Sequence, residues 1–421
     1  MNRSPILGLT LLILLSSCTS QNATTEITPE AWRADLRLLA RELPSHHANA
    51  FHTVSRETFA GEVARLDAAI PRMNGNEVLV GLMRIVALIG DGHTHLDLPP
   101  SFLRYPIELQ WFGDELRVVA AAAPYHAAVG ARVLAIGSSS MRDVMERTTQ
   151  LVPRGENDGR TRLTATMQLT SPRVLRGLGV IADQENAPFV LELATGERTT
   201  MTLSPAPLGD FSSWRMATGE RPPLYLQRLN EPWWAESLPD AQTVYFSFNS
   251  YPPDAEFSDR AAALTRLLDE SHARRLVIDL RRNEGGDLDR FRRLLLPMIK
   301  ARAAINRKGG LFVITGPGTF SAAAVNALDL RNEANAILVG TPTGIRPNHY
   351  GDHGEFRLPN SGFRISYSTQ YHRFGADTDS AVVPDRNIEP TWAEFSTGRD
   401  PVLERILSTT STRMPQPSES K

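Results

Sequence analysis

Apolar residues recur at helical spacing over the first part of the chain. Thr28-Pro29 suits a helix start, because threonine can cap a helix and proline fits its first turn. Three amphipathic stretches follow, and Gly90 ends the third. Their apolar positions are Trp32, Leu36, Leu39 and Leu43, then Phe59, Val63, Leu66 and Ile70, then Val78, Leu82, Ile85 and Ile89. We therefore expect a helical domain over residues 28–95 that ends in an exposed Asp-Gly-His-Thr-His segment.

The next hundred residues change to short runs typical of strands, so we expect a β-rich domain over residues 100–205. The predicted strands are Ile107–Phe112, Leu116–Ala121, Ala131–Ile136, Phe189–Leu193 and Thr199–Leu203, with a helix over Ser140–Thr148. Residues 129–148 resemble the strand and helix that follow the binding groove of a PDZ domain. The alternative is a β-rich spacer without a binding function.

Residues 206–240 contain several prolines and three tryptophans, and we expect an irregular linker that packs on its neighbours, because exposed tryptophan is costly. Strands and helices alternate from residue 242 onward. The expected strands are Thr243–Phe248, Leu276–Leu280, Leu311–Thr315 and Ile337–Gly340, and helices fall between them. This order predicts a mainly parallel, buried sheet in an α/β domain over residues 241–410. We expect a hairpin over residues 356–368, a last helix near Val402–Leu407 and a polar tail over 411–421.

Composition narrows the classes of protein. The chain has 421 residues, of which 41% are hydrophobic and 22% charged, so full disorder and a multi-span membrane protein are excluded. The net charge of −2 makes a general nucleic-acid binder improbable, since phosphate binding needs a field of Lys and Arg. The single cysteine excludes an intrachain disulfide and a Cys-rich zinc site.

The amino terminus has the pattern of a targeting signal. Arg3 precedes an apolar run, Ile6–Leu15, that is short for a membrane span, and Leu15-Ser16-Ser17-Cys18 follows. This resembles a bacterial lipoprotein signal over residues 1–18 with its lipobox, which implies lipidation of Cys18. An ordinary secretory signal is the alternative. Residues 19–27 would be a polar tether. No acidic residue follows the cysteine, so we expect a lipid-anchored protein at the bacterial outer membrane, facing the periplasm.

Two glycine- and serine-containing turns are candidates for chemistry. Gly285 and Gly286 follow a predicted strand, and their N–H groups are suited to binding a developing oxyanion. Ser321 lies between a strand and an Ala-rich helix, where positive potential favours an alkoxide. The alternative interpretation of Ser321 is an ordinary helix N-cap.

The third candidate is the segment with His93 and His95. A neutral imidazole is the usual base for a serine nucleophile. The two histidines also suit a metal, but no third ligand is evident in the sequence, so we expect no metal site. A packing or surface histidine is the remaining alternative.

Taken in order, these segments resemble the S41 peptidases, the family of C-terminal processing proteases and the tricorn core protease. The matching segments are DGHT, the PDZ-like region, LVIDLRRNEGG, TFSAAA, ILVGTPTG and VVPDRNIEPT. The resemblance implies a multi-domain α/β protein with a ClpP/crotonase-like core and no cofactor. It also implies cleavage of peptide or protein substrates through a serine nucleophile.

Carried over by motif, the resemblance assigns Ser321 as nucleophile, with the N–H of Ala322 and one from Gly285 or Gly286 as the oxyanion hole. The processing-protease branch uses a lysine base, and Arg346 stands at that position. Because arginine stays protonated in proteins, it cannot serve as this base. The tricorn-like branch uses a histidine, which matches His93.

The third catalytic group is poorly defined by this match. The family position for a carboxylate falls on Thr378, flanked by two supporting acid candidates, Asp377 and Asp379. Arg346 is suited instead to clamping a substrate carboxylate. We therefore expect an S41-type serine peptidase. The alternatives are a catalytically silent, ligand-binding relative and an esterase, and the sequence leaves the oligomeric state open.

Overall fold

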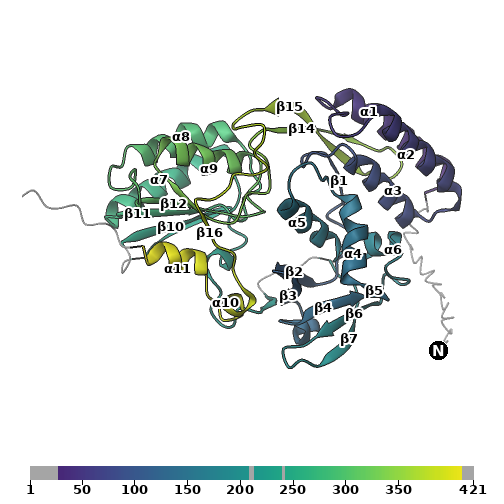
Figure 1. Cartoon of the computed structure of the whole chain (residues 1–421), viewed down its shortest axis with the longest axis horizontal. Coiled ribbons are helices and arrows are strands. Elements are labelled where there is room, and N and C mark those ends of the chain that lie inside the picture. Colours follow the sequence, from purple (N-terminus) through teal and green to yellow (C-terminus); the bar gives the residue numbers. More distant parts are fainter. Residues whose placement is uncertain (1–26, 208–212, 239–241, 410–421) are drawn as a thin grey trace, which may run out of the picture.

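In the computed structural model, the described residues are 27–207, 213–238 and 242–409. Their strands form three sheets, which we call the hairpin sheet, the β-rich sheet and the parallel sheet. Figure 1 shows the parallel sheet and its helices on one side of the molecule and the other parts on the opposite side. The predicted signal, Cys18 and most of the tether lie outside the described residues, as does the polar tail.

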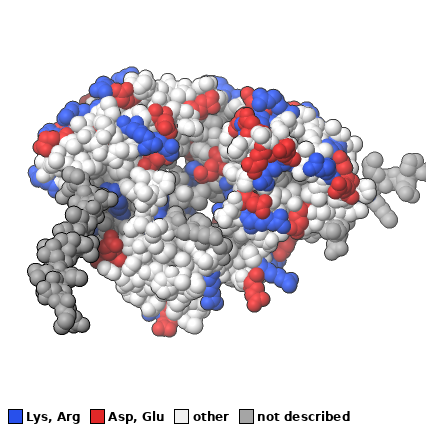
Figure 2. Space-filling model, turned by 180° about the vertical axis from the view of Figure 1, so that it is seen from behind, with Lys and Arg blue, Asp and Glu red and all other residues white. Residues whose placement is uncertain are grey.

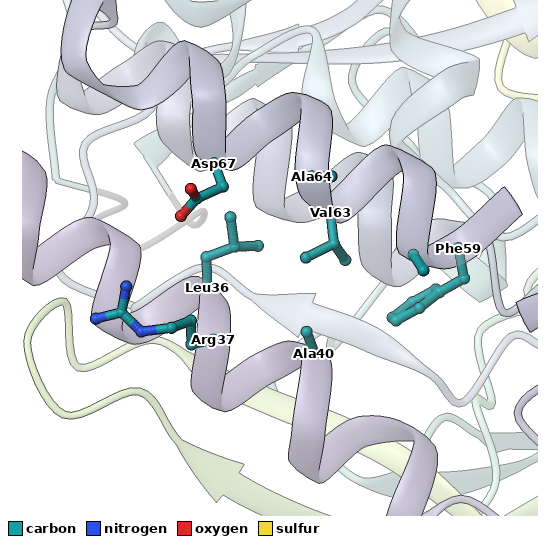
Figure 3. A pocket seen from close by; sticks show the side chains of 8 residues that line it. Leu36, Arg37, Ala40, Phe59, Val63, Ala64 and Asp67 are labelled. Carbon is teal, nitrogen blue, oxygen red and sulfur yellow. The ribbon is translucent and has the colours of Figure 1, made fainter. Parts of the chain in front are cut away.

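The helical region forms as its periodicity predicts. It comprises α1 (Pro29–His46), α2 (Arg56–Ala69), a 3-10 turn η1 (Ile70–Arg72) and α3 (Gly75–Ala87). Side chains of Thr28, Ser55 and Asn74 cap the three α-helices. An apolar groove runs between α1 and α2, with Phe59 toward one end and Asp67 toward the other (Figure 3). None of the helices in the described ranges is both long and apolar enough to cross a membrane.

The hairpin sheet joins the helical region to the rest of the molecule. It consists of β1 (His95–Asp97), β15 (Arg364–His372) and β14 (His349–Arg357), all antiparallel. Its turn rests on α1, where the buried carboxylate of Asp35 accepts the N–H groups of Asn360 and Ser361 at 3.0 and 2.8 Å. We expected this hairpin within the 241–410 domain. That expectation was wrong, because the apolar side chains of the hairpin enter the core of the helical region. Figure 1 shows β14 and β15 extending toward α1.

The β-rich sheet has the strand order β2-β3-β4-β6-β7, and all of its pairings are antiparallel. Its elements are β2 (Ile107–Phe112), β3 (Glu115–Ala121), η2 (Tyr125–Ala128), β4 (Arg132–Ile136), β5 (Ser139–Ser140), α4 (Met141–Thr148), η3 (Thr149–Leu151), α5 (Asp158–Gln168), α6 (Pro172–Gly177), β6 (Ala187–Glu192) and β7 (Arg198–Leu203). The predicted strands are confirmed, whereas α5 and α6 were not expected. Peptide binding by this region stays a prediction.

The parallel sheet carries the expected alternation of strands and helices. Its order is β16-β13-β12-β11-β10-β9, and only the β9–β10 pair is antiparallel among the described strands. Its elements are β9 (Trp233–Leu238), β10 (Thr243–Phe248), α7 (Asp254–Glu270), β11 (Arg275–Asp279), α8 (Leu288–Lys300), β12 (Leu311–Thr315), α9 (Ala322–Glu333), β13 (Ile337–Gly340), β16 (Arg386–Asn387), α10 (Trp392–Ser396) and α11 (Pro401–Leu407). Helices α7, α8 and α9 cover one face, and α11 covers the other.

The segment predicted as an irregular linker is partly ordered into strands. Besides η5 (Leu224–Leu226), it contains β8 (Arg215–Met216), which pairs with β3, and the edge strand β9. Trp233 and Trp234 explain the difference. Because successive strand residues face opposite sides, Trp233 enters the core under α7 while Trp234 enters the core under α11.

Figure 2 shows acidic and basic side chains interspersed over one face of the molecule.

Candidate active site

Ser321 stands at a sharp turn between β12 and α9. Its backbone has φ 48° and ψ −129°, which is unusual for a residue with a side chain. In the described part of the chain, its hydroxyl makes no capping bond to α9. The N-cap interpretation therefore fails, and the turn presents the hydroxyl away from the helix, as the nucleophile turns of serine hydrolases do.

The turn before Ser321 is fastened to the loop that follows β11. The Thr319 hydroxyl donates to Leu280 O at 2.8 Å, and the Phe320 N–H donates to Asn283 O at 3.0 Å. Asn283 is fully buried, and its side-chain amide donates to Phe248 O at 2.9 Å. The two loops are consequently held in a fixed relation at the ends of neighbouring parallel strands, where α/β proteins commonly place their sites.

The two glycines lie beside the serine. Gly285 has φ +105°, and a Cβ atom added there would stand 2.7 Å from Ser321 Cβ and 2.9 Å from Ala322 N. Its own N–H donates to Asn283 Oδ1 at 2.9 Å. By contrast, the N–H groups of Gly286 and Ala322 have no hydrogen-bond acceptor among the described residues. Of the expected oxyanion donors, these two remain available to a ligand.

His93 reaches the same place from the helical region. It lies in the turn between α3 and β1, and its backbone N–H donates to Asp91 Oδ1 at 3.1 Å. Its Nε2 is 2.9 Å from Ser321 Oγ, although the two residues are far apart in sequence. The aromatic rings of Phe320 and His349 flank the imidazole, with ring centroids 4.8 and 5.8 Å away. The structure thus brings the predicted nucleophile and base into hydrogen-bonding contact.

The surroundings of His93 keep its imidazole neutral. Burial lowers its pKa to about 3, His349 acts in the same direction, and Asp91 and the backbone of Tyr350 oppose them. The Nδ1 atom is buried and makes no hydrogen bond of ordinary geometry among the described residues, although the backbone of Tyr350 lies close enough to raise the pKa. For Nε2 to accept the serine proton, Nδ1 must carry the ring hydrogen. The imidazole is therefore available as an acceptor, but its second nitrogen is not anchored.

Hydrogen bonds among buried side chains support the turn that carries His93. Asp91 Oδ2 lies 2.8 Å from His47 Nε2, and Asp91 Oδ1 accepts the hydroxyl of Ser368 at 2.6 Å. His47 Nδ1 accepts the N–H of Asn49, so Nε2 is the nitrogen that donates to the carboxylate. Asp91 belongs to the DGHT motif, but the sequence contained no signal for His47 or Ser368 as its partners.

Arg346, which the motif match places at the position of a lysine, is exposed. Its Nε donates to Glu156 O at 3.1 Å. Arg346 and Arg373 belong to the walls of a cavity of about 640 Å³ that also contacts Asp91, Glu156 and His349. Sequence analysis did not identify Glu156, which is 4% exposed, or the buried β14 residue His349.

The remaining candidates lie elsewhere. Asp377 accepts from Asn348 at 2.7 Å, and Asp379 accepts from the Ala376 N–H at 3.2 Å. Neither carboxylate hydrogen-bonds His93 in the described ranges, so the structure does not assemble them with the base. His95 is exposed and lies 3.1 Å from Asp97 Oδ1. No group of three or more potential metal ligands occurs among the residues that the structure describes.

Known structures share this architecture. A point mutant of CPAF aligns with a TM-score of 0.64 at 12% identity, over 92% of this chain and 99% of that chain. Mature CPAF complexed with lactacystin aligns with a TM-score of 0.63 at 13% identity, over 90% and 97% of the two chains. The chain has the CPAF fold.

The likeness to CPAF is one of structure alone. No family model matches the sequence, and no curated protein matches it. The predicted multi-domain α/β fold is confirmed, and it extends over the helical, β-rich and parallel-sheet parts together. At this identity, fold does not decide activity, so the chemistry has to be argued from the site.

Proposed function

We propose that the protein is a serine peptidase in which Ser321 is the nucleophile and His93 the general base. The observation that carries this proposal is the 2.9 Å contact between Ser321 Oγ and His93 Nε2, made by a serine that does not cap its helix within the described chain. A nucleophile and a base within hydrogen-bond reach, beside unused N–H donors, form the constellation needed for acyl transfer.

The reaction follows from these positions. Ser321 Oγ attacks the carbonyl carbon of the substrate while its proton moves to His93 Nε2. The N–H groups of Gly286 and Ala322 would receive the carbonyl oxygen as it becomes negative. His93 then donates the proton to the leaving amine, so the C–N bond breaks and an acyl-enzyme forms. Water, deprotonated by His93, attacks that ester and restores the serine.

Arg346 has a separate role in this proposal. A guanidinium is suited to binding a carboxylate of the substrate, and Arg346 lies in the wall of the cavity that also contacts Asp91 and His349. Replacing Arg346 by alanine should raise KM for peptides more than it lowers kcat, because the lost contact holds the substrate in the ground state as well. A loss confined to kcat, measured on the same peptides, would contradict this role.

One observation favours a second candidate, a catalytically silent ligand-binding protein. The buried Nδ1 of His93 makes no hydrogen bond of ordinary geometry among the described residues, whereas a catalytic histidine is usually oriented through that atom. This alternative predicts intact folding and ligand binding with no turnover. An esterase, the third reading, would use the same residues on a more reactive carbonyl.

Hydrolysis of a peptide library and of matched esters separates these functions. We expect peptide cleavage by the wild-type protein and its loss in Ser321→Ala and in His93→Ala. Ester cleavage that peptides fail to inhibit would favour the esterase. Folded wild-type protein that cleaves neither class, at any pH from 5 to 9, would favour the silent relative.

We also infer that Cys18 anchors the protein to the outer membrane through lipid. The support is the charged, apolar and small-residue sequence that precedes this single cysteine. Several acyl chains give stable anchoring where one is marginal. In cell fractionation, Cys18→Ala should move the protein from the membrane to the soluble fraction. Retention of the variant in the membrane would contradict lipid anchoring.

A further inference from the structure

A short segment of the β-rich region lies between the loops of the candidate active site. It runs from Gly155 to Arg160, just before and into α5. Asn157 caps α5 and donates to Thr343 O at 2.9 Å, while Arg160 donates to Glu284 Oε1 at 2.8 Å. The Arg160 guanidinium also lies over the ring of Phe320, 4.1 Å from its centroid. The segment therefore touches the surroundings of both the nucleophile and the glycine loop.

Glu156 makes the most specific of these contacts. Its Oε1 accepts the N–H of Gly92 at 2.9 Å, and its Oε2 accepts the N–H of Arg346 at 3.3 Å. Gly92 directly precedes His93. A carboxylate that accepts two peptide N–H groups from different loops fixes the distance between those loops. An added Cβ at Gly92 would stand 2.6 Å from the Phe320 ring and 3.2 Å from Glu156 Cγ, so a larger residue there would displace these side chains.

Backbone packing makes the arrangement tight. A Cβ added at Gly155 would stand only 1.9 Å from Gly90 O, so the backbones of these two segments are in direct contact. Displacing Glu156 would therefore move the turn that carries His93.

We infer that Glu156 is a positioning residue for the catalytic base: its buried carboxylate joins the peptide group before His93 to the Arg346 loop and so holds Nε2 at Ser321. This inference rests on the proposed function. Glu156 touches neither reacting atom, and it acts through Gly92. Nothing in the sequence motif marks it.

The ionised carboxylate suits this role better than the acid form. A carboxylate accepts through both oxygens, whereas a protonated acid turns one of them into a donor and weakens the contact with the Arg346 N–H. Burial raises the pKa of Glu156 to about 7; Asp91 acts the same way, and the Gly92 and Arg346 contacts oppose it. The cavity beside Glu156 gives protons a route. Titratable and charged groups around it are Asp91, Arg346, His349, His52 and Arg373.

The test is the rate at which a fluorophosphonate labels Ser321 between pH 5 and 9. For the wild-type protein we expect the rate to rise with pH through about pH 7, the range in which Glu156 ionises. Glu156→Gln should label at least tenfold more slowly at pH 8 and should lose this rising limb. A purely structural role would lower the rate without changing the shape of the pH profile.

Asp35→Asn is the matched control. Asp35 is also a buried carboxylate that accepts two peptide N–H groups, but they belong to the hairpin turn. This variant should keep the wild-type pH profile. A Glu156→Gln protein with the wild-type rate, or with an unchanged rising limb, would overturn the inference.

Hydrogen exchange supplies a readout that needs no reactivity. Glu156→Ala should speed exchange in the peptide covering residues 90–95, since the Gly92 N–H loses its acceptor, and Asp35→Asn should not. Unchanged exchange there would overturn the inference by itself. Failure of wild-type labelling would instead count against the proposed function, while labelling that is lost in Ser321→Ala but normal in Glu156→Gln would defeat only this inference.

Discussion

Ser321 occupies a strained backbone conformation that the surrounding contacts maintain. A positive φ costs a residue with a side chain about 1–3 kcal/mol, and here φ is 48°. The fixed contacts of Thr319 and Phe320 to the neighbouring loop hold the turn in place. In this conformation the hydroxyl does not cap the helix and instead lies within hydrogen-bonding distance of His93 Nε2.

Gly285→Ala tests how closely the glycine loop approaches the serine. The added methyl group would meet Ser321 Cβ at 2.7 Å and Ala322 N at 2.9 Å, and the residue has a positive φ. We expect fluorophosphonate labelling to fall by about 100-fold, a loss typical of a damaged oxyanion site. The measurement is the labelling rate at pH 8.

Gly196→Ala is the control for this substitution. Gly196 also has a positive φ, but no described atom lies within 4 Å of its added Cβ. It should lose stability through backbone strain and keep the wild-type labelling rate. Equal labelling losses in both variants would show that strain alone, and not the approach to Ser321, is responsible.

Among the elements, those that rest on local periodicity were predictable from sequence. The three amphipathic helices, the strands of the parallel sheet and the turn before α9 all follow from apolar spacing and from glycine positions. The hairpin was misassigned because its partners are distant in sequence. Ile365 pairs with Leu96 across β1, and Asp35 holds the turn, contacts that no local pattern contains.

Local motifs also decide which residues of the candidate site could be predicted from the sequence. Ser321, His93 and the two glycines lie in motifs with recognisable order, so sequence identified them. Glu156 and His47 act through hydrogen bonds to residues far away in the sequence, and neither stands in a motif. Asp377 and Asp379 were chosen by sequence position beside Thr378, but their carboxylates accept hydrogen bonds from Asn348 and from the Ala376 N–H.

At the element scale, Asp400 connects α11 to the parallel sheet. It caps α11 through the N–H groups of Val402 and Leu403, and it accepts from Arg281 Nη2 at 2.6 Å. The Arg281 side chain is only 12% exposed. Arg281 also pairs with Asp279 at 2.6 Å, so it keeps one carboxylate partner when Asp400 is changed. Because a buried hydrogen bond between charged groups contributes about 1.5–3 kcal/mol, Asp400→Asn should cost about 2 kcal/mol of stability, seen as a lower urea midpoint.

Asp269→Asn is the comparison for this prediction. Asp269 pairs with Arg302 at 3.0 Å, but its side chain is 63% exposed. Exposed pairs contribute about 0–1 kcal/mol, so the midpoint should change little. Similar shifts for both substitutions would contradict the importance assigned to burial at Asp400.

For the whole molecule, the site depends on how three parts meet. The parallel sheet supplies Ser321 and the glycines, the helical region supplies His93, and the β-rich region supplies Glu156. The pKa values of two of these groups are shifted in opposite directions. The pKa of Glu156 is raised to about 7 and that of His93 is lowered to about 3, chiefly by burial.

The pH dependence of stability should show the Glu156 contribution. Its raised pKa means that the folded protein retains a proton which the unfolded chain releases, so stability is lost as pH rises from about 4.5 to 7. Relative to the wild type, Glu156→Gln should therefore gain roughly 3 kcal/mol between pH 4.5 and 8. Urea unfolding of both proteins at the two pH values measures this gain. A difference that is constant with pH would contradict it.

His93 works in the other direction. Its lowered pKa means that the unfolded chain binds a proton that the folded protein excludes, so stability is lost as pH falls from about 6.5 toward 3. The two effects oppose one another between about pH 4.5 and 6.5, which is why the comparison uses Glu156→Gln and not the wild-type curve alone.

The most direct test of the central claim is covalent labelling of the serine. Wild type, Ser321→Ala and His93→Ala would each be treated with a fluorophosphonate and weighed as intact proteins. The account predicts one added phosphonyl group on the wild type and none on either variant, because activation needs both residues of the 2.9 Å pair. Labelling that survives Ser321→Ala, or a folded wild-type protein that is never labelled, would contradict the claim.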